Sequence, residues 1–177
     1  MIDEFLLKSH VQRVENWPHE GMGSLDITPL FRNPVTTRMI TDAMTQRYLE
    51  QDISHIVALD AGGFLLGSNL SYVLNLPLVL IRKPGKLPPP VESLEFASGQ
   101  STNILEIQRD TLPEDATVLV VDDLIATGST ALAATQLLQR SGASVIEVAA
   151  IIAMSNSGGL ERLSDTGIAN YSLLMLD

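Results

Sequence analysis

The segment that most restricts how this chain can fold is VLVVDDLIATGST, at residues 118–130. It begins with an unbroken run of β-branched and aliphatic residues, which is typical of a central parallel strand buried on both faces. Two adjacent carboxylates, Asp122 and Asp123, follow the run, and small residues then lead into an expected helix at 129–141. Together with the alternation of strands and helices along the rest of the chain, this unit predicts a three-layer α/β fold around a mainly parallel sheet.

The loop that follows the two carboxylates has the composition of a phosphate site. Gly128 allows a tight turn and a close approach of a ligand, and the free N–H groups at the start of the next helix attract an anion. The threonine and serine hydroxyls of TGST add further donors. Asp122 and Asp123 would repel a phosphate, so they suit the hydroxyl groups of a sugar. The segment predicts a sugar phosphate site, although taken alone it also fits a capped helix after a core strand.

Strands and helices are expected to alternate along most of the remaining chain. The apolar patterns predict helices at 3–15, 34–52 and 64–74, and strands at 53–59, 76–81, 105–107, 144–154 and 170–176. Loops are expected at 20–24, which is rich in glycine, at 84–90, which holds four prolines, and at 91–103, which is polar and expected to be mobile. Ligands of parallel sheets bind at the carboxyl ends of the strands. That rule brings together four residues, Asp60, Arg82, Asp122 and Ala153.

Composition narrows the class of protein. A chain of 177 residues without cysteine is expected to form one domain with no disulfide framework and no thiolate site. The formal net charge of −10 argues against a nucleic-acid partner. Neither a membrane span nor a signal peptide is predicted, so we expect a cytoplasmic protein. Three of the eleven basic residues, Arg82, Lys83 and Lys86, lie within five positions, which fits an anion site and a solvated loop equally well.

Taken with its neighbours, VVDDLIATGST resembles the phosphoribosyl pyrophosphate signature of the type I phosphoribosyltransferase family. Further segments are similar, in the same order, to the adenine phosphoribosyltransferase branch of that family. They are LDITPLFRNP (25–34), ALDAGGFLLG (58–67), LIRKPGKLP (80–88), SLEF (93–96), LEIQRD (105–110) and GGLERL (158–163). Their co-occurrence is far more specific than any single match. It implies the type I fold in a single domain over 1–177, with a small N-terminal hood for the base at about 1–33 and a core at 34–177.

The resemblance implies an activity, the transfer of a ribosyl phosphate group from phosphoribosyl pyrophosphate to a purine in purine salvage. Adenine is the expected base, and AMP and pyrophosphate are the expected products. The residues expected to hold the ribose 5-phosphate are Asp122, Asp123, Ala126, Thr127, Gly128, Ser129 and Thr130. The residues expected to face pyrophosphate are Ala61, Gly62, Arg82, Lys83 and Lys86. Gly23 and Leu25 are expected in the base pocket, and Glu95 is expected to assist proton transfer at the purine as its loop closes.

The same resemblance implies a cofactor and a partner. Mg²⁺ is expected to bridge pyrophosphate oxygens and to be held by substrate and water, with no direct protein ligand. A homodimer is implied because a neighbouring subunit commonly contributes near the basic loop in this family. Trp17, just before Pro18, is expected to pack within the hood, with a platform for the base as the alternative.

Several residues depart from the family's pattern around the base and the pyrophosphate. Gly62 and Leu25 each stand where the family usually has an arginine, Phe96 replaces a tyrosine, Ala153 replaces an acidic residue, and the loop after Phe96 is longer. Loss of one charge-assisted contact to an anion costs about 1.5–3 kcal/mol, or roughly ten- to over a hundredfold in affinity. An arginine at position 62 is therefore expected to tighten donor binding.

These departures leave two hypotheses. The first is an enzyme with a different base preference or weaker donor binding. The second is a regulatory relative that binds the donor or a nucleotide without turnover. Retention of Glu95 and of the three clustered cations favours the enzyme.

Overall fold

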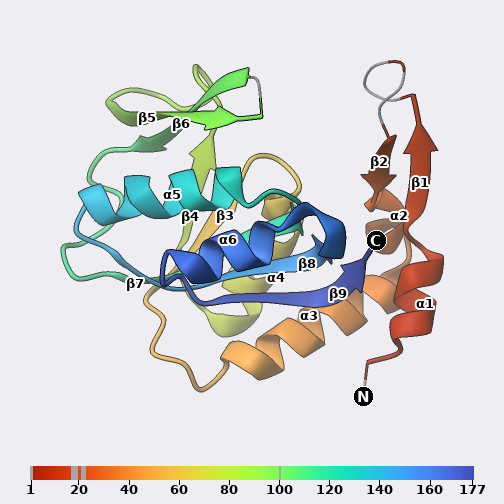
Figure 1. Cartoon of the computed structure of the whole chain (residues 1–177). Helices are drawn as coiled ribbons and strands as arrows, with labels where there is room; N and C mark the ends of the chain where they lie inside the picture. Colours follow the sequence, from red (N-terminus) through yellow and green to blue (C-terminus); the bar gives the residue numbers. More distant parts are fainter. Residues whose placement is uncertain (1, 17–19, 21–22, 100) are drawn as a thin grey trace.

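A seven-stranded sheet, with the strand order β5-β6-β4-β3-β7-β8-β9, organises the chain in the computed structural model (Figure 1). The structure describes residues 2–16, 20, 23–99 and 101–177, so Trp17 lies outside the described residues. The strands of the large sheet are β3 (His55–Leu59), β4 (Leu78–Arg82), β5 (Val91–Ser98), β6 (Ser101–Gln108), β7 (Thr117–Ile125), β8 (Ser144–Met154) and β9 (Asn170–Leu176). The five strands from β4 to β9 in this order run parallel, and β6 pairs antiparallel with both of its neighbours, β4 and β5. The expected mainly parallel α/β sheet is confirmed.

Helices cover both faces of this sheet. They are α1 (Glu4–Ser9), α2 (Thr28–Arg32), α3 (Pro34–Tyr48), α4 (Gly63–Leu74), α5 (Ser129–Arg140) and α6 (Gly159–Asp165), with a short 3-10 turn, η1 (Ser155–Ser157). In β7, Val118 and Val120 pack in the core beneath α5 and α6, whereas Leu119 and Val121 pack in the core beneath α3 and α4. All four are fully buried, which is why the sequence of β7 is continuously apolar. Within the described ranges, no helix is both long and apolar enough to cross a membrane.

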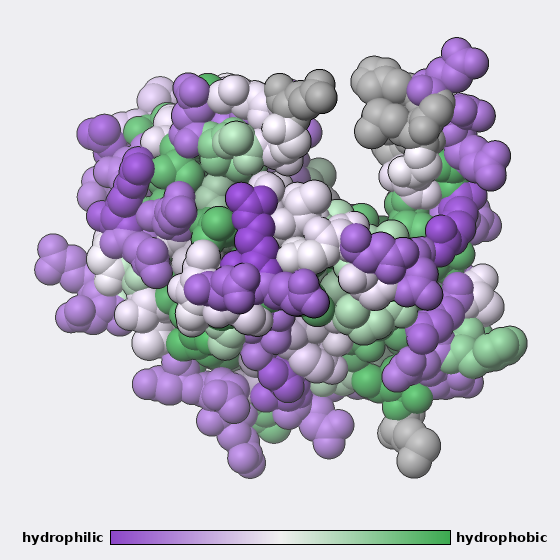
Figure 2. Space-filling model, in the orientation of Figure 1, coloured by the Kyte–Doolittle hydropathy of each residue, from purple (hydrophilic) through white to green (hydrophobic). Residues whose placement is uncertain are grey.

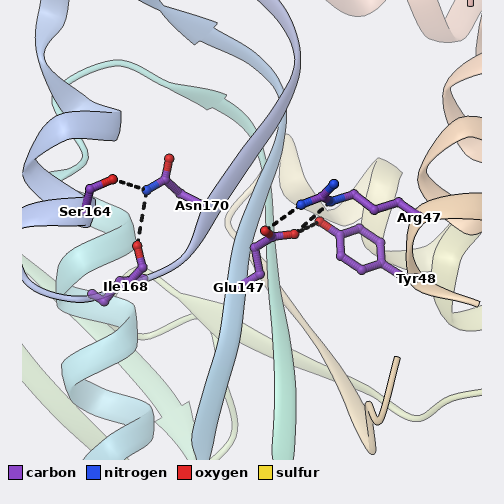
Figure 3. A network of polar contacts seen from close by, with 6 residues as sticks. All are labelled: Arg47, Tyr48, Glu147, Ser164, Ile168 and Asn170. Atoms are coloured by element: carbon purple, nitrogen blue, oxygen red, sulfur yellow. Dashed lines mark hydrogen bonds and ion pairs between the residues drawn. The ribbon is translucent and has the colours of Figure 1, made fainter. Parts of the chain in front are cut away.

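A polar cluster attaches helix α3 to the sheet (Figure 3). Arg47 donates two hydrogen bonds to the carboxylate of Glu147 in β8, at 2.9 and 2.8 Å, and the Tyr48 hydroxyl donates a third at 2.6 Å. The Arg47 guanidinium also lies 3.9 Å from the centre of the Tyr171 ring in β9. Burial, followed by the hydrogen bond to Glu147, raises the pKa of Tyr48. The end of α3 is therefore fixed against β8 and β9 by specific contacts as well as by apolar packing.

The N-terminal region differs from the helix expected at 3–15. Helix α1 ends at Ser9, and strand β1 (Gln12–Glu15) then pairs antiparallel with β2 (Gly23–Asp26) to form the hood (Figure 1). Pairing with β2, the next strand along the chain, outweighs the local helical pattern here. The loop expected at 20–24 is wrong at Gly23 and Ser24, which belong to β2, and residues 21–22 lie outside the described residues.

The mobile loop expected at 91–103 is a β-hairpin of β5 and β6, whose register runs from Val91↔Gln108 to Ser98↔Ser101. Leu94 is buried between exposed neighbours, so the segment alternates apolar and polar residues as a half-buried strand does. The strand expected at 105–107 is the buried end of β6. Strand β7 also continues past the predicted end at Val121 to Ile125, because the long strand β8 supplies partners as far as Ala153.

Candidate functional site

The carboxyl ends of three neighbouring parallel strands bring three of the predicted residues together. Ala58 lies opposite Val121 and Leu59 lies opposite Ile81, so the residues that follow emerge at the same edge of the sheet. Asp60 and Arg82 meet there as an ion pair, with Arg82 Nε 3.1 Å from Asp60 Oδ2. Asp122 follows Val121 directly on the adjacent strand. The fourth residue, Ala153, is fully buried and pairs with Ile125, further along the same edge.

Asp122 and Asp123 form the acidic part of this edge. The backbone N–H of Asp123 donates to Asp122 Oδ1 at 2.9 Å. Burial, and then the negative charge of Asp123, raise the pKa of Asp122 well above its ordinary value. The two carboxylates lie within strand β7, past the last residue paired with β3, and β8 holds this part of the strand from the other side, with Asp122 opposite Ala150 and Leu124 opposite Ile152. Such rigid support suits groups that must present oxygen atoms in a fixed direction.

Two glycines allow the turn between β3 and α4 to approach this acidic pair. A Cβ atom on Gly63 would lie 2.6 Å from the Val121 carbonyl oxygen, which is backbone and cannot move away cheaply. A Cβ atom on Gly62 would lie 2.1 Å from Asp123 Oδ2. The Asp123 carboxylate thus lies directly over Gly62. An arginine at position 62 would first have to displace Asp123, so the expected gain in donor binding has a steric cost that the sequence did not reveal.

The loop from Ala126 to the start of α5 has the conformation that its sequence predicts. Gly128 has a φ of +72°, in the left-handed region that favours glycine, and it precedes α5 with no side-chain cap. Ser129 is buried, and its Oγ lies 3.1 Å from the exposed Thr127 Oγ1. Backbone N–H groups and hydroxyl groups therefore converge on one short turn, as an anion site requires.

The start of α6 supports this loop from behind. A Cβ atom on Gly159 would lie 2.1 Å from the Ala126 carbonyl oxygen and 2.9 Å from the Gly128 nitrogen. From the same helix, Arg162 Nη1 donates to Ser129 Oγ at 2.8 Å. No role was predicted for Gly159 or Arg162 from the sequence. Their only signal was the segment GGLERL at 158–163.

The basic residues differ in how firmly they are held. Arg82 bonds Asp60, donates to the Lys86 carbonyl oxygen at 3.2 Å and lies 5.2 Å from the centre of the Phe64 ring. Lys83 and Lys86 are exposed, and within the described part of the chain their side chains form no ion pair. The arginine is therefore fixed in place, whereas the two lysines can reach toward a ligand.

Glu95 is not brought into contact with the acidic pair in this structure. It is exposed on β5, while its neighbours Leu94 and Phe96 pack against the core. Its side chain forms no ion pair with any residue that the structure describes. In Figure 1 the hairpin that carries it lies at the upper left of the molecule and the hood lies at the right.

A cavity of about 460 Å³ separates the hood from the core. Its hood side is lined by Arg13, Val14, Glu15, Gly23, Ser24 and Leu25, and its core side by Leu124, Ala126, Met154 and Ser157. Figure 2 shows the surface hollowed between the hood and the rest of the molecule. The cavity joins both predicted base-pocket residues to the first residue of the predicted phosphate loop. Arg13 and Glu15 also line it, and sequence reasoning missed both.

No group of three or more histidine or acidic side chains among the described residues could hold a metal ion. Two cavities of similar size lie beside α3, but neither is lined by a residue of the strand ends described above. The candidate functional site is therefore the sheet edge at the carboxyl ends of the strands, where the acidic pair, the loop before α5 and the hood cavity meet.

Comparison with known proteins identifies the class of protein to which this site belongs. The phosphoribosyl transferase domain model matches residues 27–169, and the chain belongs to that family. It is 50% identical over 173 residues to the adenine phosphoribosyltransferase of Pseudomonas paraeruginosa, covering 98% of this chain and 95% of that protein. A Marinomonas adenine phosphoribosyltransferase is 45% identical over 177 residues, with 100% and 98% covered. Within the family, the chain therefore belongs with the adenine phosphoribosyltransferases.

Solved structures agree with this assignment. The adenine phosphoribosyltransferase of Rhodothermus marinus superposes with a TM-score of 0.92 at 31% identity, covering 97% of each chain. That of Saccharomyces cerevisiae, complexed with an imino-altritol bisphosphate and adenine, gives a TM-score of 0.87 at 31% identity, with 96% and 97% covered. The predicted type I fold and family are both confirmed.

Proposed function

We propose that this protein transfers the ribosyl 5-phosphate group of phosphoribosyl pyrophosphate to adenine, releasing AMP and pyrophosphate in purine salvage. The observation that carries the proposal is the cavity between hood and core, because it places Gly23 and Leu25 across from Ala126. A base in the cavity would lie next to a sugar phosphate on the loop. The 50% identity to an adenine phosphoribosyltransferase supports the same activity.

The donor's ribose 5-phosphate would bind at the end of β7. The turn at Gly128 and the uncapped start of α5 supply N–H donors for the phosphate, and Thr127, Ser129 and Thr130 supply hydroxyl groups. The carboxyl oxygens of Asp122 and Asp123 would accept hydrogen bonds from the ribose hydroxyls. Ala126 closes the loop against Gly159, so the phosphate position would be fixed by backbone packing.

Pyrophosphate would lie between the turn before α4 and the basic loop. Ala61 and Gly62 offer backbone at the end of β3, and the fixed guanidinium of Arg82 faces the same edge. The exposed side chains of Lys83 and Lys86 would complete the neutralisation of the anion. Mg²⁺, carried by pyrophosphate oxygens and water, would offset further negative charge on the leaving group.

Catalysis would consist of alignment and charge stabilisation. The purine ring nitrogen forms its bond to the sugar carbon as the bond from that carbon to the pyrophosphate oxygen breaks. The transition state resembles an oxocarbenium ion, so fixed groups on both sides of the sugar carbon lower its energy. Closure of the β5–β6 hairpin would bring Glu95 to the base, where its carboxylate assists proton transfer, and would exclude water.

A homodimer formed through the outer face of α3 and α4 is part of this proposal. Leu65, Tyr72 and Val73 lie on one stripe of α4 and are 43%, 87% and 49% exposed, beside Val35 at the start of α3, which is 57% exposed. Cavities of about 510 and 520 Å³ flank α3 on this side. Exposed apolar side chains gathered on neighbouring helices mark interaction sites, and they carry the proposed interface.

The dimer prediction is tested by Tyr72→Arg, which places a charge at the centre of the stripe. Sedimentation velocity should show a dimer for the unchanged protein and a lighter species for the variant. Phe5→Arg is a matched control, because Phe5 is 84% exposed on α1 and lies outside the stripe. Equal dissociation by both variants, or by neither, would place the interface elsewhere.

The alternative function is a regulatory protein that binds the donor or a nucleotide without turnover. Two observations favour it: Gly62 and Leu25 lack the arginines expected from the family, and Glu95 stands away from the acidic pair. A cytoplasmic location is proposed for either function, on the cysteine-free composition.

One assay separates the two functions. The protein is incubated with Mg²⁺, phosphoribosyl pyrophosphate and, in turn, adenine, hypoxanthine, guanine or xanthine, and nucleotide formation is followed by chromatography. AMP formed from adenine, with little product from the other bases, is the expected result. A product from another base alone would correct the base preference. Donor or AMP binding without product from any base would establish the regulatory alternative.

A further inference from the structure

Arg162 reaches from α6 to the loop that the proposed function assigns to the 5-phosphate. Its Nη1 lies 2.8 Å from Ser129 Oγ, which in turn lies 3.1 Å from Thr127 Oγ1. Ser129 is buried, whereas Thr127 is exposed at the open side of the loop. A connected chain of polar groups therefore runs from a guanidinium to the place where a phosphate would bind.

The chemistry of this chain of contacts fixes the direction of its hydrogen bonds. A guanidinium only donates, so Ser129 Oγ must accept from Arg162. The two hydroxyl groups of Ser129 and Thr127 hold two hydrogens between them, and their mutual hydrogen bond uses one. The other hydrogen is left to donate into the loop, where an anion would accept it. An acceptor in place of Arg162 would instead compete for that hydrogen.

The positive charge of Arg162 matters because the loop segment itself contains no positively charged residue. Residues 122–130 contain Asp122 and Asp123 and no basic residue. Among the residues that the structure describes, Arg162 is the cationic side chain hydrogen-bonded to the loop from Ala126 to Thr130. Helix α6, which carries Arg162, is well anchored, since Leu163 is fully buried and Gly159 packs against the loop backbone.

We infer that Arg162 is a positioning residue of the 5-phosphate site. It acts through Ser129, by keeping a hydroxyl hydrogen directed at the anion and by placing a positive charge behind the loop. The inference rests on the proposed function, and it predicts a selective effect. Arg162 should strengthen the binding of nucleotides that carry a 5-phosphate and should leave nucleosides unaffected.

Calorimetric titration of the whole protein with AMP and with adenosine tests this directly. The unchanged protein should bind AMP more tightly than adenosine. Arg162→Met should weaken AMP binding about tenfold, as expected for one hydrogen bond to a charged group, with adenosine binding unchanged. Arg162→Lys, which keeps the charge but not the planar fork, should recover part of the loss. Arg140→Met is the control, because it removes the same charge from the far end of α5.

The outcomes are distinct. If the unchanged protein shows no preference for AMP, the proposed 5-phosphate site itself is wrong. If that preference exists and Arg162→Met keeps it, or loses AMP and adenosine affinity equally, the inference about Arg162 is overturned. In a Ser129→Ala background, Arg162→Met should have a much smaller further effect. An undiminished effect there would show that Arg162 does not act through Ser129.

Discussion

Gly159 offers the sharpest perturbation of the proposed phosphate site, although it lies outside the loop itself. In Gly159→Ala the new Cβ would lie 2.1 Å from the Ala126 carbonyl oxygen and 2.9 Å from the Gly128 nitrogen, where ordinary contacts are 3.4–4 Å. Both neighbours are backbone atoms, so either the loop or α6 must move by roughly 1 Å. A misplacement of about 1 Å in a substrate-positioning group can cost on the order of a hundredfold in rate, and overpacking of this kind costs about 1–3 kcal/mol of stability.

Steady-state kinetics with varied phosphoribosyl pyrophosphate, together with thermal unfolding, measures both effects. We expect kcat/KM for the donor to fall about a hundredfold. Gly142→Ala is the matched control, because Gly142 has a φ of +85° but no atom within 4 Å of an added Cβ, and it lies between α5 and β8. It should lose stability through backbone strain and keep its donor kinetics. Gly159→Ala with unaltered kinetics would refute the packing argument.

Two other variants test separate parts of the structure. The raised pKa of Asp122 means that the folded protein keeps a proton which the unfolded chain, with an aspartate pKa of about 3.9, releases. The contribution of Asp122 to stability should therefore fall as the pH rises from about 4 toward neutrality, so the unchanged protein should lose stability relative to Asp122→Asn over this range. The variant should also lose donor affinity. Parallel profiles of thermal unfolding against pH for the two proteins would contradict the assignment. Glu147→Ala breaks the cluster with Arg47 and Tyr48, and because Arg47 is 40% exposed we expect a loss of about 1–3 kcal/mol in a denaturant titration. The KM values for adenine and donor should stay unchanged, since Glu147 lies toward the amino end of β8; a large rise in either would show that the cluster supports the site.

Local patterns in the sequence predicted the helices, strands and turns that are determined by neighbouring residues in the chain. Helix α3 begins as expected because Pro34 takes the first position and the Asn33 side chain accepts from the Val35 N–H at 2.9 Å. Strand β7 was recognisable because it is buried on both faces. The site loop was predicted because the left-handed φ observed at Gly128 is one that glycine adopts without support from distant contacts.

The features that sequence reasoning missed depend on contacts between distant segments. The hairpin of β5 and β6 reads as a polar loop until Leu94 is placed against the core. The roles of Gly159 and Arg162 depend on the packing of α6 against the loop before α5, more than thirty residues earlier in the chain. The position of Asp123 over Gly62 likewise brings the end of β7 against the turn between β3 and α4, so no local pattern could show that an arginine at 62 would meet a carboxylate.

The most direct test of the proposed site is a crystal structure of this protein with AMP. The phosphate should lie on the loop from Ala126 to Thr130, the ribose hydroxyls against Asp122 and Asp123, and the adenine in the cavity bordered by Leu25. AMP bound in that orientation would establish how the site holds the product of the proposed reaction. AMP bound elsewhere, or with its base at the acidic pair and its phosphate in the hood cavity, would contradict the assignment of both subsites.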